Sequence, residues 1–387
     1  SIGEAAFSGC ENLNHVDFPD GLKIIGTDAF SNCITLEGVD LPSSIERIDN
    51  RAFAGARNIC YAPLSSRLNR LGESAFSGCR MLQAVKIPAG IKKIPSDLFL
   101  GCEKLGQIEI EAGIVSIGSR ALSGCISLTN VELPDSVTEI CDRAFKGDRN
   151  LKSIRLSPKT LEIGAEAFAG CSSLEKVSVP LSVREIGAGA FDCCWALADS
   201  DGYVTSMGVC YGNVDPSLIN AVVPVKISSI AAGAFRERKN LRSVTLPDSV
   251  DTVGGHAFVD CPELREVFLS EKVHTLGEKP FAGCDKLESV IAPGMNLEKF
   301  SEQRDRICAV LGYCRRSEIY YGDCKISYEN WLSNDINALE ILLAAVERNM
   351  QDAVRFFTQK KMISSEVFPK ILEAAQNRHV MEIIAIL

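Results

Sequence analysis

The sequence predicts a repeat solenoid: a curved parallel β-sheet stack of about 12 to 13 turns of 23 residues, followed by a small α-helical C-terminal domain. Three observations predict it. One sequence motif recurs every 23 residues, and apolar residues recur with it at fixed positions. After Pro293 the 23-residue period stops, and apolar residues follow the spacing of an α-helix. The anchor position of the phrase is occupied by Phe7, Phe30, Phe53, Phe76, Phe99, Leu122, Phe145, Phe168, Phe191, Phe235, Phe258 and Phe281.

Each turn is expected to contain one short strand. In the turn that ends at Phe145, the recurring apolar positions are Leu128, Val131 and Leu133. Pro134 should end the strand, because proline has no amide hydrogen to donate to a neighbouring strand. Alternation around Val131 has a period of two, so the intervening side chains should point outward and the apolar ones inward.

The period is interrupted once, between Phe191 and Phe235. These two anchors are 44 residues apart, and residues 199–213 fit no position of the repeat. We interpret the irregular stretch as a hairpin packed on the stack, with a binding protrusion as the alternative. The interval concentrates aromatic residues in a chain that has only two Trp and seven Tyr. These are Trp195, Tyr203 and Tyr211.

Residues 1–297 are expected to form the solenoid, and residues 298–387 the helical domain. An apolar stripe at helical spacing begins at Leu339 and continues through Leu342, Leu343 and Val346. A weaker repeat relates Ile341 to Ile371, 30 residues later. Helix pairs at this interval resemble ankyrin-type units, although the Thr-Pro-Leu-His phrase of that family is absent. The helices either cap the open end of the solenoid or lead into further chain.

The repeated phrase reads like I-G-x-x-A-F-x-G-C-x-x-L-x-x-V-x-L-P-x-S-V. It resembles the leucine-rich repeats of the BspA or Treponema type, and the resemblance covers about Ile2 to Pro293. The family implies a leucine-rich repeat solenoid with a parallel sheet on one face. It occurs in surface and secreted proteins of oral and gut bacteria and of some protozoa, and it implies no single ligand.

The outward columns of the sheet are the predicted site of function, because they do not pack the core. Their mixture of polar types suits a protein or peptide partner better than a sugar, for which we expect an aromatic row. A merely solvated face is the alternative. The predicted partner-binding residues are Tyr61, Lys86, Gln107, Glu109, Asn130, Glu132, Ser153, Arg155 and Lys176.

A second patch is predicted from the aromatic residues of the irregular interval together with Phe268 and Ile291. These two apolar residues occupy outward columns in the last turns. Exposed apolar side chains at such positions suggest that the helical segment, or a partner, covers them.

The charge balance argues against nucleic acid as a partner. The net charge is −9, whereas phosphate binding needs clustered Lys and Arg, and anionic membranes are disfavoured for the same reason. No apolar run approaches the roughly 18 to 20 residues of a membrane helix, so membrane insertion is not expected. No signal peptide is visible, but the chain opens in mid-repeat at Ser1, which is compatible with a removed leader.

No catalytic, cofactor or metal site is predicted. The G-x-S-x-G, H-E-x-x-H and Walker-type phrases are missing, and the four histidines are scattered. Cys308, Cys314 and Cys324 lack a neighbouring His or a C-x-x-C pair, which disfavours zinc and leaves a disulfide among them open. Nine of the sixteen cysteines share one repeat column and are expected to be buried free thiols. They are Cys10, Cys33, Cys79, Cys102, Cys125, Cys171, Cys194, Cys261 and Cys284.

These observations predict a non-enzymatic protein-recognition scaffold. The family resemblance implies a bacterial surface or secreted protein of the adhesin type. One alternative is an intracellular scaffold, which reduced cysteines and the helical tail would favour. The other is the targeting region of an enzyme whose catalytic domain lies outside these residues.

Overall fold

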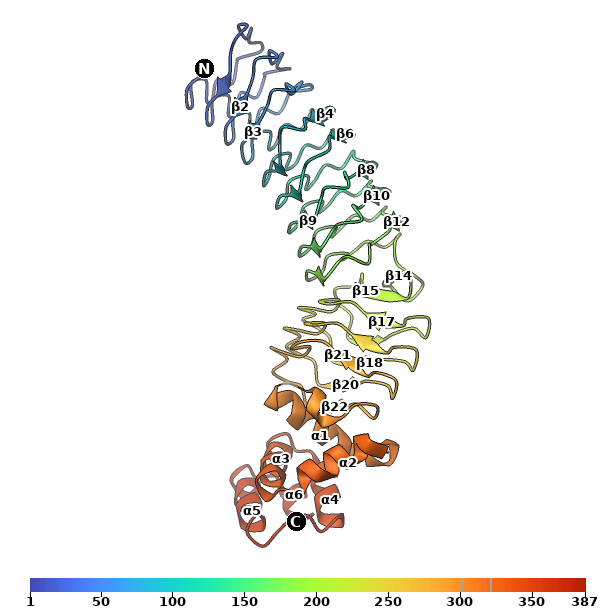
Figure 1. Ribbon diagram of the computed structural model, residues 1–387. Coiled ribbons are helices and arrows are strands. Elements are labelled where there is room, and N and C mark those ends of the chain that lie inside the picture. Colours follow the sequence, from blue (N-terminus) through green and yellow to red (C-terminus); the bar gives the residue numbers. More distant parts are fainter. Residues whose placement is uncertain (301, 321) are drawn as a thin grey trace. The chain divides into compact units, whose positions relative to one another are not determined.

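The computed structural model describes residues 1–300, 302–320 and 322–387 (Figure 1). The chain divides into two compact units. Unit 1 contains Ser1–Ser206 and Tyr211–Pro216, and unit 2 contains Met207–Cys210 and Ser217–Leu387. Paired strands of successive turns are 23 residues apart, which confirms the predicted solenoid of about 12 turns. Helices follow the last turn, as predicted.

The strands that the sequence predicts lie in one row in unit 1. They form a two-stranded and a three-stranded parallel sheet, which together we call the first sheet. All described pairs in it are parallel, and each residue pairs with its equivalent one turn later. The strands are β4 (Ala84–Ile87), β6 (Gln107–Ile110), β8 (Asn130–Glu132), β10 (Ser153–Arg155) and β12 (Lys176–Val177).

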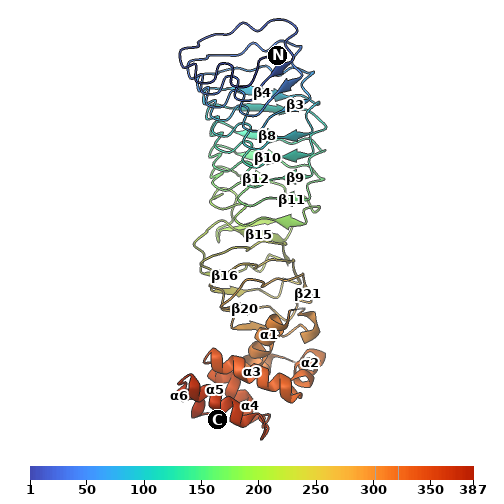
Figure 2. The ribbon, with the colours of Figure 1, turned by 90° about the vertical axis from the view of Figure 1, so that its left-hand side faces the viewer.

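Unit 1 also has a second row of strands, which the prediction of one strand per turn missed. These strands form a three-stranded and a five-stranded parallel sheet, which together we call the second sheet. Its strands have two residues each and lie one above another along the stack, as β3, β9 and β11 show in Figure 2. They are β1 (Ile24–Ile25), β2 (Arg47–Ile48), β3 (Arg70–Leu71), β5 (Lys93–Ile94), β7 (Ser116–Ile117), β9 (Glu139–Ile140), β11 (Glu162–Ile163) and β13 (Glu185–Ile186).

Glycine after the second strand lets neighbouring turns approach closely. A Cβ atom added at Gly72 would lie 2.3 Å from the backbone nitrogen of Asn50, and one at Gly164 would lie 2.4 Å from that of Asp142. Real Cβ atoms do not come so close to backbone atoms. The Ile-Gly step of the repeated phrase is therefore a packing requirement of the stack.

The core of each unit is a column of stacked side chains. The rings of Phe53 and Phe76 are stacked with centroids 5.2 Å apart, and both side chains are fully buried. Leu128, Val131 and Phe145 are 0%, 2% and 0% exposed, so the predicted inward faces are confirmed. Each turn buries its apolar side chains against the turns next to it, as expected for a solenoid.

The irregular interval forms β14 (Tyr203–Ser206) and β15 (Val209–Asn213). Within unit 1, the amide of Val214 donates to the carbonyl of Gly202 over 2.9 Å. The Asn213 side-chain amide donates to the carbonyl of Asp201 over 3.0 Å. These bonds join the two ends of the irregular stretch to each other.

The solenoid part of unit 2 repeats the same two-sheet design. The first sheet contains β16 (Asn220–Val222), β18 (Ser243–Thr245), β20 (Glu266–Phe268) and β22 (Ser289–Ile291). The second sheet of this unit includes β17 (Ser229–Ile230), β19 (Thr252–Val253) and β21 (Thr275–Leu276).

Six α-helices follow in the described part of unit 2. They are α1 (Gln303–Arg316), α2 (Gly322–Leu332), α3 (Asp335–Glu347), α4 (Gln351–Gln359), α5 (Phe368–Asn377) and α6 (Met381–Ile384). Ile341 of α3 and Ile371 of α5 are both fully buried, and α3 packs against α4 and α5. Asn349 and His379, 30 residues apart, both have a positive φ in the turns that end α3 and α5. The weak 30-residue repeat is therefore a repeat of helix pairs.

Helix α1 covers the last turn of the solenoid. A Cβ atom at Gly312 would lie 2.3 Å from the carbonyl oxygen of Val290, so the helix backbone rests directly on β22. The thiol of Cys308 donates to the carbonyl of Leu287 over 3.3 Å, and Nη1 of Arg348 donates to that of Glu288 over 3.2 Å. The carbonyl of Arg265, equivalent to that of Glu288 one turn earlier, accepts from the amide of the next turn, so Arg348 replaces a contact that a further turn would make. The helices therefore cap the last turn, which is one of the two roles expected for them.

Candidate functional site

The outward columns of the first sheet of unit 1 form a polar surface. In β4 the exposed residues Ala84 and Lys86 alternate with the buried residues Val85 and Ile87, as a period of two requires. Of the nine predicted partner-binding residues, Ser153 is half-buried and the others are exposed. The structure thus brings these residues onto one face, and their role in binding stays a prediction.

Polar contacts between turns order this face. Nζ of Lys86 lies 2.7 Å from Oε1 of Glu109 and 3.0 Å from Oε1 of Glu111, and the hydrogen bond to Glu109 is the main cause that raises the pKa of Lys86. The hydroxyl of Ser153 donates to Oδ1 of Asn130 over 2.6 Å. Exposed ion pairs contribute roughly 0 to 1 kcal/mol, so a partner can displace them at small cost.

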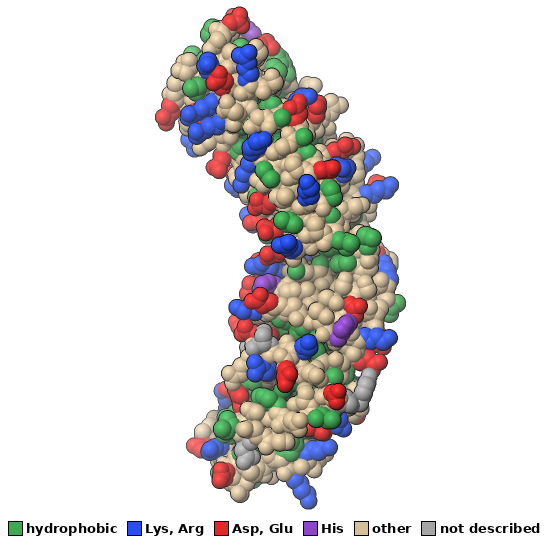
Figure 3. Space-filling model, viewed as in Figure 1, with side chains coloured by type: hydrophobic (Ala, Val, Ile, Leu, Met, Phe, Trp, Pro, Cys, Tyr) green, Lys and Arg blue, Asp and Glu red, His purple; other side chains and the backbone are tan. Residues whose placement is uncertain are grey.

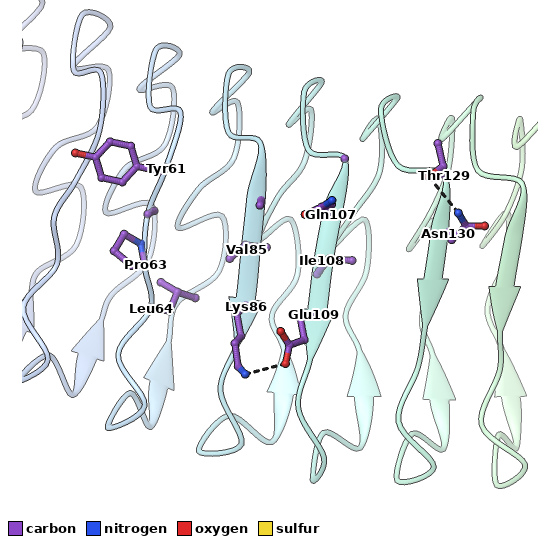
Figure 4. Close-up of a pocket in the computed structure, with 13 residues that line it drawn as sticks. Tyr61, Pro63, Leu64, Val85, Lys86, Gln107, Ile108, Glu109, Thr129 and Asn130 are labelled. Atoms are coloured by element: carbon purple, nitrogen blue, oxygen red, sulfur yellow. Dashed lines mark hydrogen bonds and ion pairs between the residues drawn. The ribbon is translucent and has the colours of Figure 1, made fainter.

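A groove of about 760 Å³ crosses the outward columns (Figure 4). Apolar side chains, among them Val85 and Ile108, contribute to its lining, and the Lys86–Glu109 ion pair lies along it. The lining residues are Tyr61, Ala62, Pro63, Leu64, Ala84, Val85, Lys86, Gly106, Gln107, Ile108, Glu109, Thr129 and Asn130. Five of them belong to the set predicted from the sequence.

Tyr61 is held in place by two contacts that its position in the repeat does not reveal. Its hydroxyl donates to Oδ2 of Asp40 over 2.9 Å, and this hydrogen bond is the main cause that raises the pKa of Tyr61. Its ring lies over Gly38, where an added Cβ atom would be 2.3 Å from Cε1 of the ring. The side chain is nevertheless 43% exposed and contributes to the lining at one end of the groove.

Sequence reasoning missed Leu64 and Thr129 in the groove. Leu64 follows the outward column position of Pro63, and Thr129 precedes that of Asn130. Both residues lie beside the alternating segment rather than within it. Their contribution depends on how the backbone bends at each end of the strand, and the repeat pattern contains no signal for that bend.

The residues of the predicted second patch have different environments. In unit 1, Trp195 is 55% exposed, whereas Tyr203 and Tyr211 are 3% and 6% exposed. In unit 2, Phe268 is half-buried and Ile291, in the strand against which α1 packs, is 4% exposed. Among these five aromatic and apolar side chains, only Trp195 presents most of its surface to solvent.

The cysteine column is buried, as predicted, at eight of its nine positions, and Cys10 is the exposed exception. Each buried thiol donates to the carbonyl of the anchor residue 26 positions earlier, as in Cys79 to Phe53 over 3.3 Å and Cys171 to Phe145 over 3.1 Å. All sixteen cysteines are free, including Cys308, Cys314 and Cys324. The buried column thiols therefore act as small hydrophobic residues that also donate a hydrogen bond to the preceding turn.

Asp148 replaces cysteine in this column. Its side chain is fully buried, its Oδ1 accepts a hydrogen bond from the amide of Cys125 over 2.8 Å, and its Oδ2 has no hydrogen-bond partner. Burial raises the pKa of the Asp148 carboxyl well above its usual value. Among the described residues there is no cluster of metal-binding side chains, and no helix there is long and apolar enough to span a bilayer.

Comparisons with known proteins agree with the repeat pattern. A family model described as a BspA-type leucine-rich repeat region of six copies matches residues 1–106, 92–201 and 209–304. None of the curated proteins that were compared matches the chain.

Several solved structures are similar to the chain. A leucine-rich repeat protein from Bacteroides ovatus is 23% identical over 75% of this chain and 82% of its own, with a TM-score of 0.52, which shows the fold. A leucine-rich repeat protein from T. pallidum is 32% identical over 42% of this chain and 76% of its own, with a TM-score of 0.39. A leucine-rich cell surface protein from Faecalibacterium prausnitzii is 26% identical over 76% and 71%, with a TM-score of 0.34.

Proposed function

Because the chain belongs to the BspA-type leucine-rich repeat family, we propose that it is a non-enzymatic scaffold that binds a protein or peptide in the groove beside Tyr61. The observation that carries this proposal is the groove itself, in which apolar lining, an anchored aromatic ring and polar side chains meet on the outward face of the first sheet. Tyrosine is among the residues that most often dominate binding energy at protein interfaces.

The dimensions of the groove suit an extended peptide segment. From Tyr61 to Asn130 the groove crosses four turns, or three intervals of about 4.8 Å each, which gives roughly 14 Å. An extended chain rises about 3.3 Å per residue, so about four to five residues of a partner can lie along it. An apolar side chain of the partner fits against Tyr61, and a basic one fits beside Glu109 and Glu111.

A selection of peptides from a displayed random library against the intact protein tests this proposal. Tyr61→Ala should weaken binding of the selected peptides about tenfold or more, which corresponds to about 1.4 kcal/mol. Met81→Ala is the matched control, because Met81 is 42% exposed in the same unit and does not line the groove. Peptides that bind the wild-type protein and both variants equally would exclude the groove as the binding site.

The family resemblance further supports an adhesin-like protein at a bacterial surface. An intracellular scaffold is the second candidate, which the sixteen free cysteines favour. Labelling of intact source cells with an amine reagent that does not cross membranes separates the two. A surface protein is labelled before lysis, whereas an intracellular scaffold is labelled only afterwards. The length of the intact gene product would reveal an enzyme domain outside these residues.

A further inference from the structure

The second sheet of unit 1 carries a row of side chains that the groove does not use. In each two-residue strand from β2 to β13 in this sheet, the second residue is buried in the core. The first residues form a column whose charge changes sign once along the stack. We call this column the charge ladder, and it consists of Arg47, Arg70, Lys93, Ser116, Glu139, Glu162 and Glu185.

Like charges are direct neighbours within each half of the charge ladder. Arg47 pairs in register with Arg70, and Glu162 pairs in register with Glu139 and with Glu185. Neighbouring strands are about 4.8 Å apart, and like charges directly opposite each other destabilise a sheet. Like charges in register therefore repel one another within each half of the charge ladder.

Contacts within the chain offset part of this repulsion, and Glu185 too has a polar or electrostatic interaction within the chain. Oδ1 of Asp49 lies 2.6 Å from Nε of Arg47 and 3.6 Å from Nε of Arg70. In the acidic half, Glu139 accepts a hydrogen bond from the thiol of Cys141 over 3.4 Å, and a thiol is a weak donor. Figure 3 shows Lys and Arg side chains gathered near the top on the left side of the molecule, with Asp and Glu side chains below them.

The centre of the charge ladder differs from its two ends. Ser116 is small and buried, and the residue before it, Val115, is 44% exposed. An uncharged centre between charged ends matches the usual anatomy of a protein interface, in which charged residues are depleted from the core.

We propose that the charge ladder is a self-complementary interface through which two copies of this chain associate. Three basic residues precede Ser116 and three acidic residues follow it, so a two-fold axis at Ser116 pairs every basic residue with an acidic one. Arg47 then faces Glu185 of the second copy, Arg70 faces its Glu162, and Lys93 faces its Glu139. An interface of this kind uses the same surface on both copies, as two-fold symmetry requires.

The residues that directly precede the ladder positions have mixed charges. Lys92 adds to the basic half, whereas Glu46 offsets part of the basic half and Arg184 offsets part of the acidic half. A nucleic acid would meet repulsion from the acidic half, and an acidic or a basic peptide would be attracted by only one end. A second copy in the antiparallel orientation satisfies both halves over six intervals of about 4.8 Å, or roughly 29 Å.

Sedimentation equilibrium tests the proposal on the intact protein at concentrations up to about 100 μM, where complexes with micromolar dissociation constants are detected. The wild-type protein should dimerise at low salt, and dissociation should increase as salt screens the charges. Two triple variants reverse one half each. Arg47→Glu, Arg70→Glu, Lys93→Glu makes the whole ladder acidic, and Glu139→Lys, Glu162→Lys, Glu185→Lys makes it basic.

Each triple variant alone should be monomeric, and an equimolar mixture of the two should form heterodimers. Combining all six reversals regenerates the complementary pattern in the opposite direction and should restore the homodimer. A monomeric wild-type protein at low salt would overturn the proposal, and so would triple variants that dimerise as tightly as wild type. Peptide binding at Tyr61 uses the other sheet and should be unchanged in all variants, so the two proposals fail independently.

Discussion

Replacing Asp148 with cysteine should stabilise unit 1. The thiols at the equivalent positions of the neighbouring turns, Cys125 and Cys171, each donate to the carbonyl of the anchor residue 26 positions earlier. By the same register, a thiol at position 148 would donate to the carbonyl of Leu122. The amide of Cys125, which now donates to Asp148, already has the Leu122 carbonyl as a second partner at 3.2 Å. The substitution therefore leaves no amide without an acceptor.

The size of the gain follows from the burial of the carboxyl group. Oδ2 of Asp148 has no hydrogen-bond partner, and an unsatisfied buried polar group costs about 1 to 3 kcal/mol, with more for a charged one. Asp148→Cys should therefore raise the free energy of unfolding by about 1 to 3 kcal/mol at pH 7. Ala56→Cys is the matched control, because Ala56 is fully buried in the same column and its replacement adds a thiol without removing a carboxylate.

The stability difference between wild type and Asp148→Cys should become smaller as the pH is lowered. Burial raises the pKa of Asp148 in the folded state, so folding favours the protonated form. The contribution of Asp148 to stability is then greatest below its unfolded pKa of about 3.9 and is lost as pH rises through the folded pKa. Lowering the pH from 7 to 5 should shrink the difference between wild type and Asp148→Cys, and should leave the Ala56→Cys difference unchanged.

Urea unfolding followed by tryptophan fluorescence measures these differences. The chain has two tryptophans, Trp195 in unit 1 and Trp331 in unit 2, so a Trp331→Phe background leaves one reporter in the unit that contains Asp148. A variant less stable than wild type at pH 7, or a stability difference that does not change with pH, would refute the reasoning.

Three further predictions follow from the packing. Phe145→Ala should cost about 3 to 5 kcal/mol in urea unfolding because it leaves a cavity, whereas the exposed Arg155→Ala should change stability by less than about 0.5 kcal/mol; similar losses would mean that the faces are reversed. Gly312→Val should lower the melting temperature of unit 2 and increase hydrogen exchange in β22, since a side chain there meets the Val290 carbonyl; unchanged exchange would contradict the cap. Gly38→Ala should displace the Tyr61 ring and so break its hydrogen bond to Asp40, which should lower the phenol pKa measured by spectrophotometric titration. An unchanged pKa would show that the ring keeps its contact with Asp40.

Periodicity predicted the parts of the fold that depend on burial alone. Leu128 and Phe145 could be assigned to the core because large apolar side chains recur at positions that a stack must bury. The second sheet was missed because strands such as Arg70–Leu71 contain two residues, too few to display alternation. Their signal was the Ile-Gly step of the phrase, which marks a close approach of backbones rather than a strand.

The candidate site was predictable only as a surface. Alternation showed that Lys86 and Glu109 point outward, and their register one turn apart follows from the period. The contact of Tyr61 with Asp40 depends on the direction in which a side chain leans between turns, and the space that Gly38 leaves open allows it. Such details are set by individual residues and differ from one turn to the next.

The buried thiols also give this protein a built-in set of local probes. Unit 1 contains six buried column cysteines at known positions along the stack, and each should become reactive when its own turn separates from the neighbouring turns. The rate of modification of each thiol, measured by mass spectrometry, therefore reports how often its own turn opens. Graded rates along the chain would mean that turns open sequentially from an end, and equal rates would mean that the stack opens as one cooperative body.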